Sequence, residues 1–153
     1  MIPPNNADQI RIVHKLAALR KAGTTGESFL AALEEVELEA MLWNFPDNYT
    51  EPLVLFALFT ATPDEEGIVQ EEYLAGWIKA CATWLCLEWL RRRGALVSYT
   101  FNERVVSWPL DAIKLTSGFL ADLERQHPSL HYFAAHVFRR AAPDAKPGAA
   151  ALN

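Results

Sequence analysis

Three histidines near the end of the chain have the residue type, and one pair has the spacing, of metal ligands. His127 and His131 are four residues apart, which would place both imidazoles on one face of a helix. Pro128 stands between them and is expected to interrupt such a helix. His136 lies about 140° around a helix from His131, at roughly 100° per residue. We therefore expect no metal ion and no other cofactor.

No arrangement typical of an active site occurs in the sequence. There is no Gly-rich phosphate loop, no nucleophile elbow around a serine, and no Cys–His pair in a recognisable context. Cys81 and Cys86 lack the spacing of a CxxC pair and are interpreted as small reduced core residues. Glu34 and Glu35 are adjacent, but they lie in an acidic run, for which a solvated helix face is the usual explanation. We expect no catalytic residues and no enzyme activity.

The distribution of charge is the most unusual chemical feature. The net charge is −5, yet no Lys or Arg occurs between Lys21 and Lys79, an interval that holds twelve carboxylates. The rest of the chain carries fourteen basic and seven acidic residues, a charge of +7. The carboxylates that we take as candidate partner-binding residues are Glu34, Glu35, Glu37, Glu39, Asp64, Glu65, Glu66, Glu71 and Glu72.

An acidic surface repels nucleic-acid phosphates, attracts a basic protein surface and speeds the encounter with it. We therefore predict a protein-interaction module or inhibitor that uses residues 27–72 to bind a basic protein. A nucleic-acid-binding protein is the obvious target, and a DNA-mimicking antagonist of the phage or mobile-element type fits the size and charge. Two alternatives stay open: a solvated acidic face with no partner, and neutralisation by the basic remainder, within the fold or across a homodimer.

The candidate residues named above are expected to lie mostly on helices, because apolar residues recur mostly at helical spacing along the chain. The expected helices cover residues 5–23, 23–48, 52–62, 68–93, 111–126 and 128–140. In the second, one face carries Phe29, Leu33, Val36, Ala40 and Trp43. For residues 52–62 a buried helix is favoured, although the pattern alone does not exclude a strand.

The segment 68–93 is apolar on most sides, which predicts a central core helix, and a local break near residues 79–83 would divide it in two. After Gly94, residues 95–101 and 104–110 are rich in β-branched and aromatic residues and are expected to form a hairpin. A two-residue turn at Asn102 and Glu103 would join the strands, and a longer loop is the alternative because Asn-Glu is a weaker hairpin signal than Asn-Gly. The expected fold class is therefore mainly α with one β-hairpin.

This order of elements resembles a winged-helix domain of the bacterial repressor type, over about residues 51–126. Leu74 and Ala75 stand where that family opens the second helix of its core, "GALV" (94–97) follows Leu90 as the turn after the recognition helix, and "LTSG" (115–118) is similar to the start of its dimerisation helix. The resemblance implies an alternative function, a transcriptional regulator that binds DNA as a dimer. The candidate nucleic-acid-binding residues are Arg91, Arg92 and Arg93, with Arg104 in the hairpin.

The side chains of the predicted recognition helix argue against direct reading of bases. Base edges are read mainly by Arg, Lys, Asn, Gln, Ser and Thr, and this helix offers only Lys79 and Thr83 among its tryptophans. The three arginines lie in the last helical turn, where cations complement the helix dipole by about 0.3–1 kcal/mol each. A basic protein partner is therefore favoured over nucleic acid.

The start of the chain lacks a basic segment followed by an apolar one, so no signal peptide is expected. The longest apolar run, residues 53–59, is far shorter than the roughly 20 residues that span a bilayer. We expect a cytoplasmic protein without membrane association, with a single mainly helical domain over residues 1–140 and a disordered tail over residues 141–153.

Overall fold

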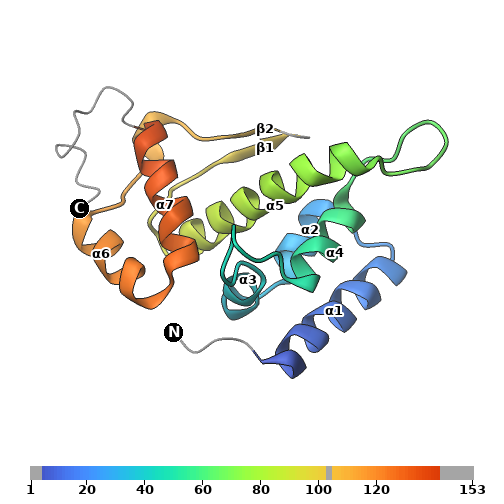
Figure 1. Cartoon of the computed structure of the whole chain (residues 1–153). Coiled ribbons are helices and arrows are strands. Elements are labelled where there is room, and N and C mark those ends of the chain that lie inside the picture. The colour runs from blue at the N-terminus through green and yellow to red at the C-terminus, as the bar shows by residue number, and fades with distance from the viewer. Residues whose placement is uncertain (1–4, 103–104, 142–153) are drawn as a thin grey trace.

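Helix α5 (Glu71–Arg92) runs through the middle of the molecule, and the other helices pack around it (Figure 1). The structure is a computed structural model that describes residues 5–102 and 105–141. Every residue of α5 from Trp84 to Leu90 is buried, which requires neighbours on all sides of the helix. The prediction of a central core helix is confirmed.

The protein is mainly helical, as predicted. The other elements within the described residues are α1 (Asn6–Lys21), α2 (Gly26–Ala32), α3 (Glu35–Met41), α4 (Glu51–Thr60), β1 (Thr100–Asn102), β2 (Val105–Ser107), a 3-10 turn (Leu110–Ala112), α6 (Ser117–Gln126) and α7 (Pro128–Ala141).

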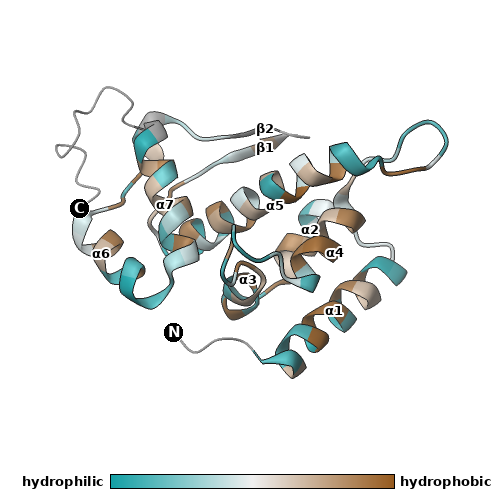
Figure 2. Cartoon of the chain, viewed as in Figure 1, coloured by the Kyte–Doolittle hydropathy of each residue, from teal (hydrophilic) through white to brown (hydrophobic). Residues whose placement is uncertain are grey.

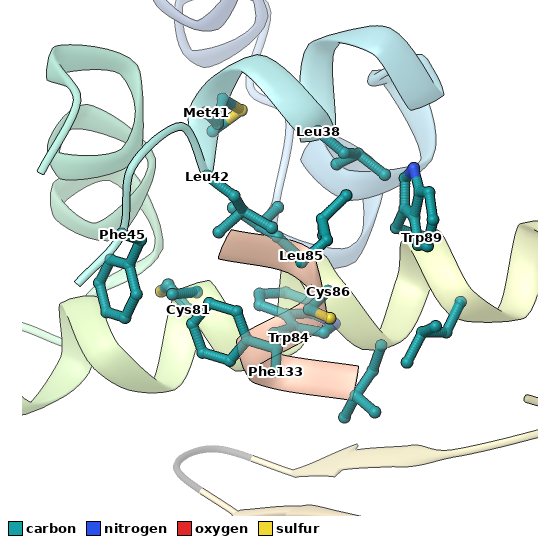
Figure 3. Close-up of a cluster of buried hydrophobic side chains, with 14 of the residues drawn as sticks. Leu38, Met41, Leu42, Phe45, Cys81, Trp84, Leu85, Cys86, Trp89 and Phe133 are labelled. Atoms are coloured by element: carbon teal, nitrogen blue, oxygen red, sulfur yellow. The ribbon is translucent and has the colours of Figure 1, made fainter. Parts of the chain in front are cut away.

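The helices that precede α5 and those that follow it form two groups in contact with it (Figure 1). α3 and α4 pack on α5 and on each other, and α1 covers α3 and α4. α6 and α7 pack together, and α7 also contacts α5. Apolar side chains from both groups meet in one cluster, in which Leu38 and Leu42, from α3 and its end, lie with Leu85 of α5 and Phe133 of α7 (Figure 3).

The predicted second helix is two helices, and this corrects the expected pattern of burial. Leu33 adopts an extended conformation at the end of α2, and α3 begins after Glu34. The break shifts the buried face, so Val36 is 57% exposed whereas Leu38 and Met41 are fully buried. Leu38 and Met41 are buried because α3 packs on both α1 and α5.

The apolar segment after Pro52 forms helix α4, as favoured from its sequence. The side chain of Thr50 caps this helix by accepting a hydrogen bond from the backbone N–H of Leu53 at 3.3 Å. Hydrophobic and hydrophilic residues alternate along α1, whereas α4 is mostly hydrophobic (Figure 2). Within the described ranges, none of the helices combines the length and the apolar composition that crossing a bilayer takes.

Helix α5 is continuous, so the break considered near residues 79–83 does not occur. It ends at Arg92, and Gly94 follows with φ of +77°, a left-handed conformation that glycine adopts without steric cost. β1 pairs antiparallel with β2, with Phe101 opposite Val106. Residues 103 and 104, which join the strands, lie outside the described residues, and the wing-like hairpin of the resemblance stays a prediction. The predicted tail beyond Ala141 lies outside them as well.

A buried histidine joins the C-terminal helices to α3. His127 lies between α6 and α7 and is 3% exposed. Its Nδ1 atom accepts a hydrogen bond from the Leu130 N–H at 3.1 Å and so caps α7, while Nε2 lies 3.1 Å from the backbone oxygen of Glu39 and donates to it. Burial lowers the pKa of His127 below its ordinary value of 6.5, because the charged ring would lose its hydration.

This arrangement predicts a pH dependence of stability. Below pH 6.5 the unfolded chain binds a proton at His127 that the folded chain does not bind until its lower pKa is reached. The free energy of unfolding is therefore expected to fall across this window as pH decreases, by up to about 1.4 kcal/mol per pH unit. Urea unfolding of the wild type and of His127→Asn, followed by circular dichroism at a series of pH values, measures this slope.

The Asn variant is the matched control because its side-chain oxygen can still cap α7 but does not titrate. Its stability should depend less on pH than that of the wild type below pH 6.5. Equal slopes for the two proteins in that window would contradict the assignment.

Candidate protein-interaction surface

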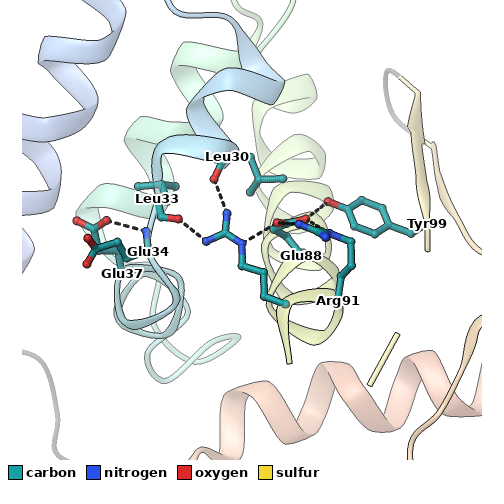
Figure 4. Close-up of polar contacts among 8 residues, drawn as sticks. Leu30, Leu33, Glu34, Glu37, Glu88, Arg91 and Tyr99 are labelled. Atoms are coloured by element: carbon teal, nitrogen blue, oxygen red, sulfur yellow. Dashed lines mark hydrogen bonds and ion pairs between the residues drawn. The ribbon is translucent and has the colours of Figure 1, made fainter. Parts of the chain in front are cut away.

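The carboxylates of the acidic segment have different environments in the fold, and Glu37 is the clearest case. It is 1% exposed, so it does not belong to an acidic surface and the prediction that it contacts a partner is wrong. Its Oε1 atom lies 2.6 Å from Lys15 Nζ and accepts the Glu34 N–H at 2.8 Å, and its Oε2 atom lies 3.0 Å from Arg11 Nη1 (Figure 4 shows the bond to Glu34). Glu37 is the internal counter-charge for two cations of α1.

The hydrogen bonds of Glu37 outweigh the effect of burial on its ionisation. Burial by itself would raise the pKa of this carboxyl, but Lys15, the Glu34 N–H and Arg11 together hold it below 4.5. Glu37 therefore stays charged at neutral pH.

Two more predicted residues of α3 have partners on α5 or directly after its end. Glu39 Oε1 accepts a hydrogen bond from Trp89 Nε1 at 3.0 Å, and Glu35 Oε2 lies 3.6 Å from Arg93 Nη1. Glu34 is exposed at the start of α3. The alternative that the basic remainder neutralises part of the acidic segment within the fold is thus confirmed for Glu35 and Glu37.

The remaining predicted carboxylates form a separate group, which we call the acidic tip: Asp64, Glu65, Glu66, Glu71 and Glu72. They occupy the loop between α4 and α5 and the first turn of α5, and all five are exposed. This loop projects from the body of the molecule (Figure 1). Within residues 5–102 and 105–141, no Lys, Arg or His forms an ion pair with any of them.

Asp64 organises the loop that carries the tip. Its Oδ1 atom accepts the N–H groups of Glu66 and Ile68, both at 2.9 Å, and its Oδ2 atom accepts from Gln70 Nε2 at 2.7 Å. These hydrogen bonds, that from Ile68 foremost, lower the pKa of Asp64. Ile68 is 51% exposed on the same loop, an apolar side chain beside the carboxylates.

The two groups of carboxylates lie near opposite ends of α5. Trp89, which binds Glu39, is seventeen residues beyond Glu72 in this helix, or about 25 Å at 1.5 Å per residue. That distance exceeds the Debye length of about 8 Å at physiological ionic strength. Salt therefore screens the two groups from each other, and they do not attract a partner jointly. The nine predicted residues are therefore not one surface.

The arginines predicted to bind nucleic acid differ in their surroundings, and Arg92 has a structural role. Its Nε atom donates to Glu88 Oε2 at 2.7 Å, Nη2 donates to the Leu30 carbonyl at 2.8 Å, and Nη1 donates to the carbonyl of Leu33 (Figure 4). All three nitrogens of the guanidinium are thus occupied inside the protein. Arg92 fastens the end of α5 to the end of α2.

Arg91 and Arg93 are more exposed but have partners of their own. Arg91 forms two hydrogen bonds to Glu88, at 2.9 Å and 2.6 Å, with its side chain 47% exposed. The guanidinium carbon of Arg93 lies 5.0 Å from the centre of a Trp89 ring, within range of a cation–π contact. Arg104 lies outside the described residues.

Glu88, the one buried carboxylate of α5, is not among the residues predicted from the sequence. It is 5% exposed and accepts hydrogen bonds from Arg91, Arg92 and Tyr99 (Figure 4). Burial would raise the pKa of Glu88, and these three donors hold it below 4.5. Its position among apolar residues four before Arg92 was the available signal, because only a paired carboxylate is tolerated there.

The structure also bears on metal binding and on thiol reactivity. Among the described residues, no three His, Cys, Asp or Glu side chains are grouped as metal ligands would be. Both cysteines are buried, and burial raises the pKa of the Cys81 thiol to about 12, which disfavours the reactive thiolate. No family model, curated protein or solved structure matched this chain.

Carboxylates with internal partners are expected to stabilise the fold, and exposed carboxylates without ion pairs are not. Replacing Glu37 by Ala leaves Lys15 and Arg11 without their counter-charge and should lower the free energy of unfolding by about 2–3 kcal/mol at neutral pH. The contribution is present above pH 4.5 and is lost as pH falls through the lower folded pKa. Chemical denaturation at pH 7 and at acidic pH measures both effects.

Glu65→Ala is the control, because Glu65 is exposed and has no ion pair with a described residue. It should change stability by no more than about 0.5 kcal/mol. A Glu37 variant as stable as the Glu65 variant would mean that Glu37 is not an internal counter-charge.

Proposed function

We propose that this chain is a non-enzymatic protein-interaction module whose acidic tip binds a basic surface on a partner protein. The observation that carries the proposal is the exposure of all five tip carboxylates, with no described Lys, Arg or His forming an ion pair with them. The fold neutralises the carboxylates of α3 in part and leaves those of the tip to solvent. Their charge is therefore available to a partner.

The geometry of the tip suits such an encounter. Charges on a projecting loop are reached by a partner before the body of the protein, and they raise the association rate with an oppositely charged surface. Ile68 adds an exposed apolar side chain among the carboxylates. An apolar contact ringed by charges is the arrangement that stabilises a complex once electrostatic attraction has brought the partners together.

The preferred partner class is a nucleic-acid-binding protein, because its phosphate-binding surface has the complementary charge. Binding there would exclude nucleic acid, so the module would act as an inhibitor of the DNA-mimicking kind. The same carboxylates would repel a nucleic-acid backbone. Direct binding of DNA, as the resemblance to winged-helix regulators implies, is the competing hypothesis.

The experiment compares two variants with the same change in charge. The tip variant carries Glu65→Gln, Glu66→Gln, Glu71→Gln and Glu72→Gln, and the control carries Glu27→Gln, Glu34→Gln, Asp47→Asn and Glu51→Gln, all at exposed positions. Asp64 is kept because its carboxylate holds the loop together. Proteins captured from the native host are identified by mass spectrometry, and the association rate of the purified partner is measured at two salt concentrations.

We expect the tip variant to associate at least about tenfold more slowly at low salt and the control to bind nearly as fast as the wild type. Equal effects of the two variants would show that only net charge matters and would refute a role for the tip. Gel shifts with random duplex DNA form the second arm. An affinity for DNA that falls steeply with salt would favour the regulator instead.

A further inference from the structure

A cavity of about 380 Å³ opens between α5, α7 and the loop that follows α3, apart from the acidic tip. Its size falls in the range of about 300–1,000 Å³ that is usual for small-molecule sites. The residues that line it are Phe45, Pro46, Lys79, Thr83, Tyr132, Phe133 and His136.

The walls of the cavity are aromatic and are held in place by the core. Phe45 and Phe133 are 6% and 4% exposed and stack with their ring centroids 5.0 Å apart (Figure 3). Tyr49 stacks on the other side of this pair, 5.2 Å from Phe45, and Tyr132 meets Phe133 edge-to-face at 5.4 Å. Because the two central rings are buried, the walls exist before any ligand arrives.

The charge at the cavity is positive, because Lys79 lines it and no Asp or Glu does. Lys79 is exposed on α5 and has no ion pair with any described carboxylate, and none of the lining residues is acidic. Thr83 and Tyr132 also line the cavity, and the Thr83 hydroxyl donates to the Lys79 carbonyl oxygen at 3.2 Å. In a protein of net charge −5, a cavity that combines an ammonium group with aromatic walls and excludes carboxylates favours an anion.

We propose that this cavity binds a small planar aromatic carboxylate. The ring of the ligand packs against Phe45, Phe133 and Tyr132, and its carboxylate faces the Lys79 ammonium group. Offset or edge-to-face contacts with preformed rings favour an aromatic over an aliphatic body. A single lysine matches one negative charge, whereas a phosphate would call for more cations. The site does not depend on the proposed function of the acidic tip.

The test uses 2-naphthoate and its neutral counterpart 2-naphthamide as probes, with dissociation constants from titration calorimetry or NMR. The first variant is Lys79→Met, which keeps most of the length of the side chain and removes its charge. The control is Lys114→Met, because Lys114 is exposed and does not line the cavity. A third variant, Tyr132→Ala, removes an aromatic wall whose side chain is 54% exposed, so the core remains intact.

We expect 2-naphthoate to bind the wild type with a dissociation constant below about 1 mM, and Lys79→Met to weaken it roughly three- to tenfold. Lys114→Met should have no effect. Tyr132→Ala should weaken both probes, and Lys79→Met should leave 2-naphthamide unchanged. The inference is overturned if 2-naphthoate fails to saturate by about 5 mM, if the two lysine variants have equal effects, or if chemical-shift changes lie away from the lining residues.

Discussion

Helix α5 is buried on every side between Trp84 and Leu90, and the only charged residue in that stretch is Glu88. A buried carboxylate is tolerated only when hydrogen bonds and opposite charges replace its hydration. Arg91, Arg92 and Tyr99 provide both, and Arg92 uses its remaining nitrogens on the carbonyls of Leu30 and Leu33. The need to satisfy Glu88 therefore ties α5 to the end of α2 and to the chain that leads into β1.

The same requirement explains why the acidic segment does not behave as one surface. Helix α3 packs between α1 and α5, both of which carry cations, so Glu37 faces Lys15 and Arg11 while Glu35 lies near Arg93. In the loop before α5, no carboxylate forms an ion pair with a described cation, although Arg20 of α1 lies on the Phe59 ring, where the loop begins. These carboxylates are exposed, so the tip, and not α3, offers negative charge to a partner.

The candidate sites differ in how far the sequence could reveal them. The tip residues are consecutive or nearly so, and a turn rich in Asp and Glu is expected to be exposed. Glu37 lies in the same acidic run as Glu34 and Glu39, but its partners Lys15 and Arg11 are 22 and 26 residues away. The aromatic cavity joins residues from 45 to 136, so no local pattern indicates it.

Local signals are enough to place most helices, because apolar periodicity, the caps at Thr50 and Thr116, the turn at Gly94 and the helix start at Pro128 act within a few residues. Contacts between distant segments set where the predicted second helix breaks, which face of α3 is buried and which charges are exposed. At Leu33 the carbonyl that a longer helix would use is bonded to Arg92, 59 residues away. Such choices depend on free energies of packing and desolvation between segments distant in sequence, which only the folded chain brings together.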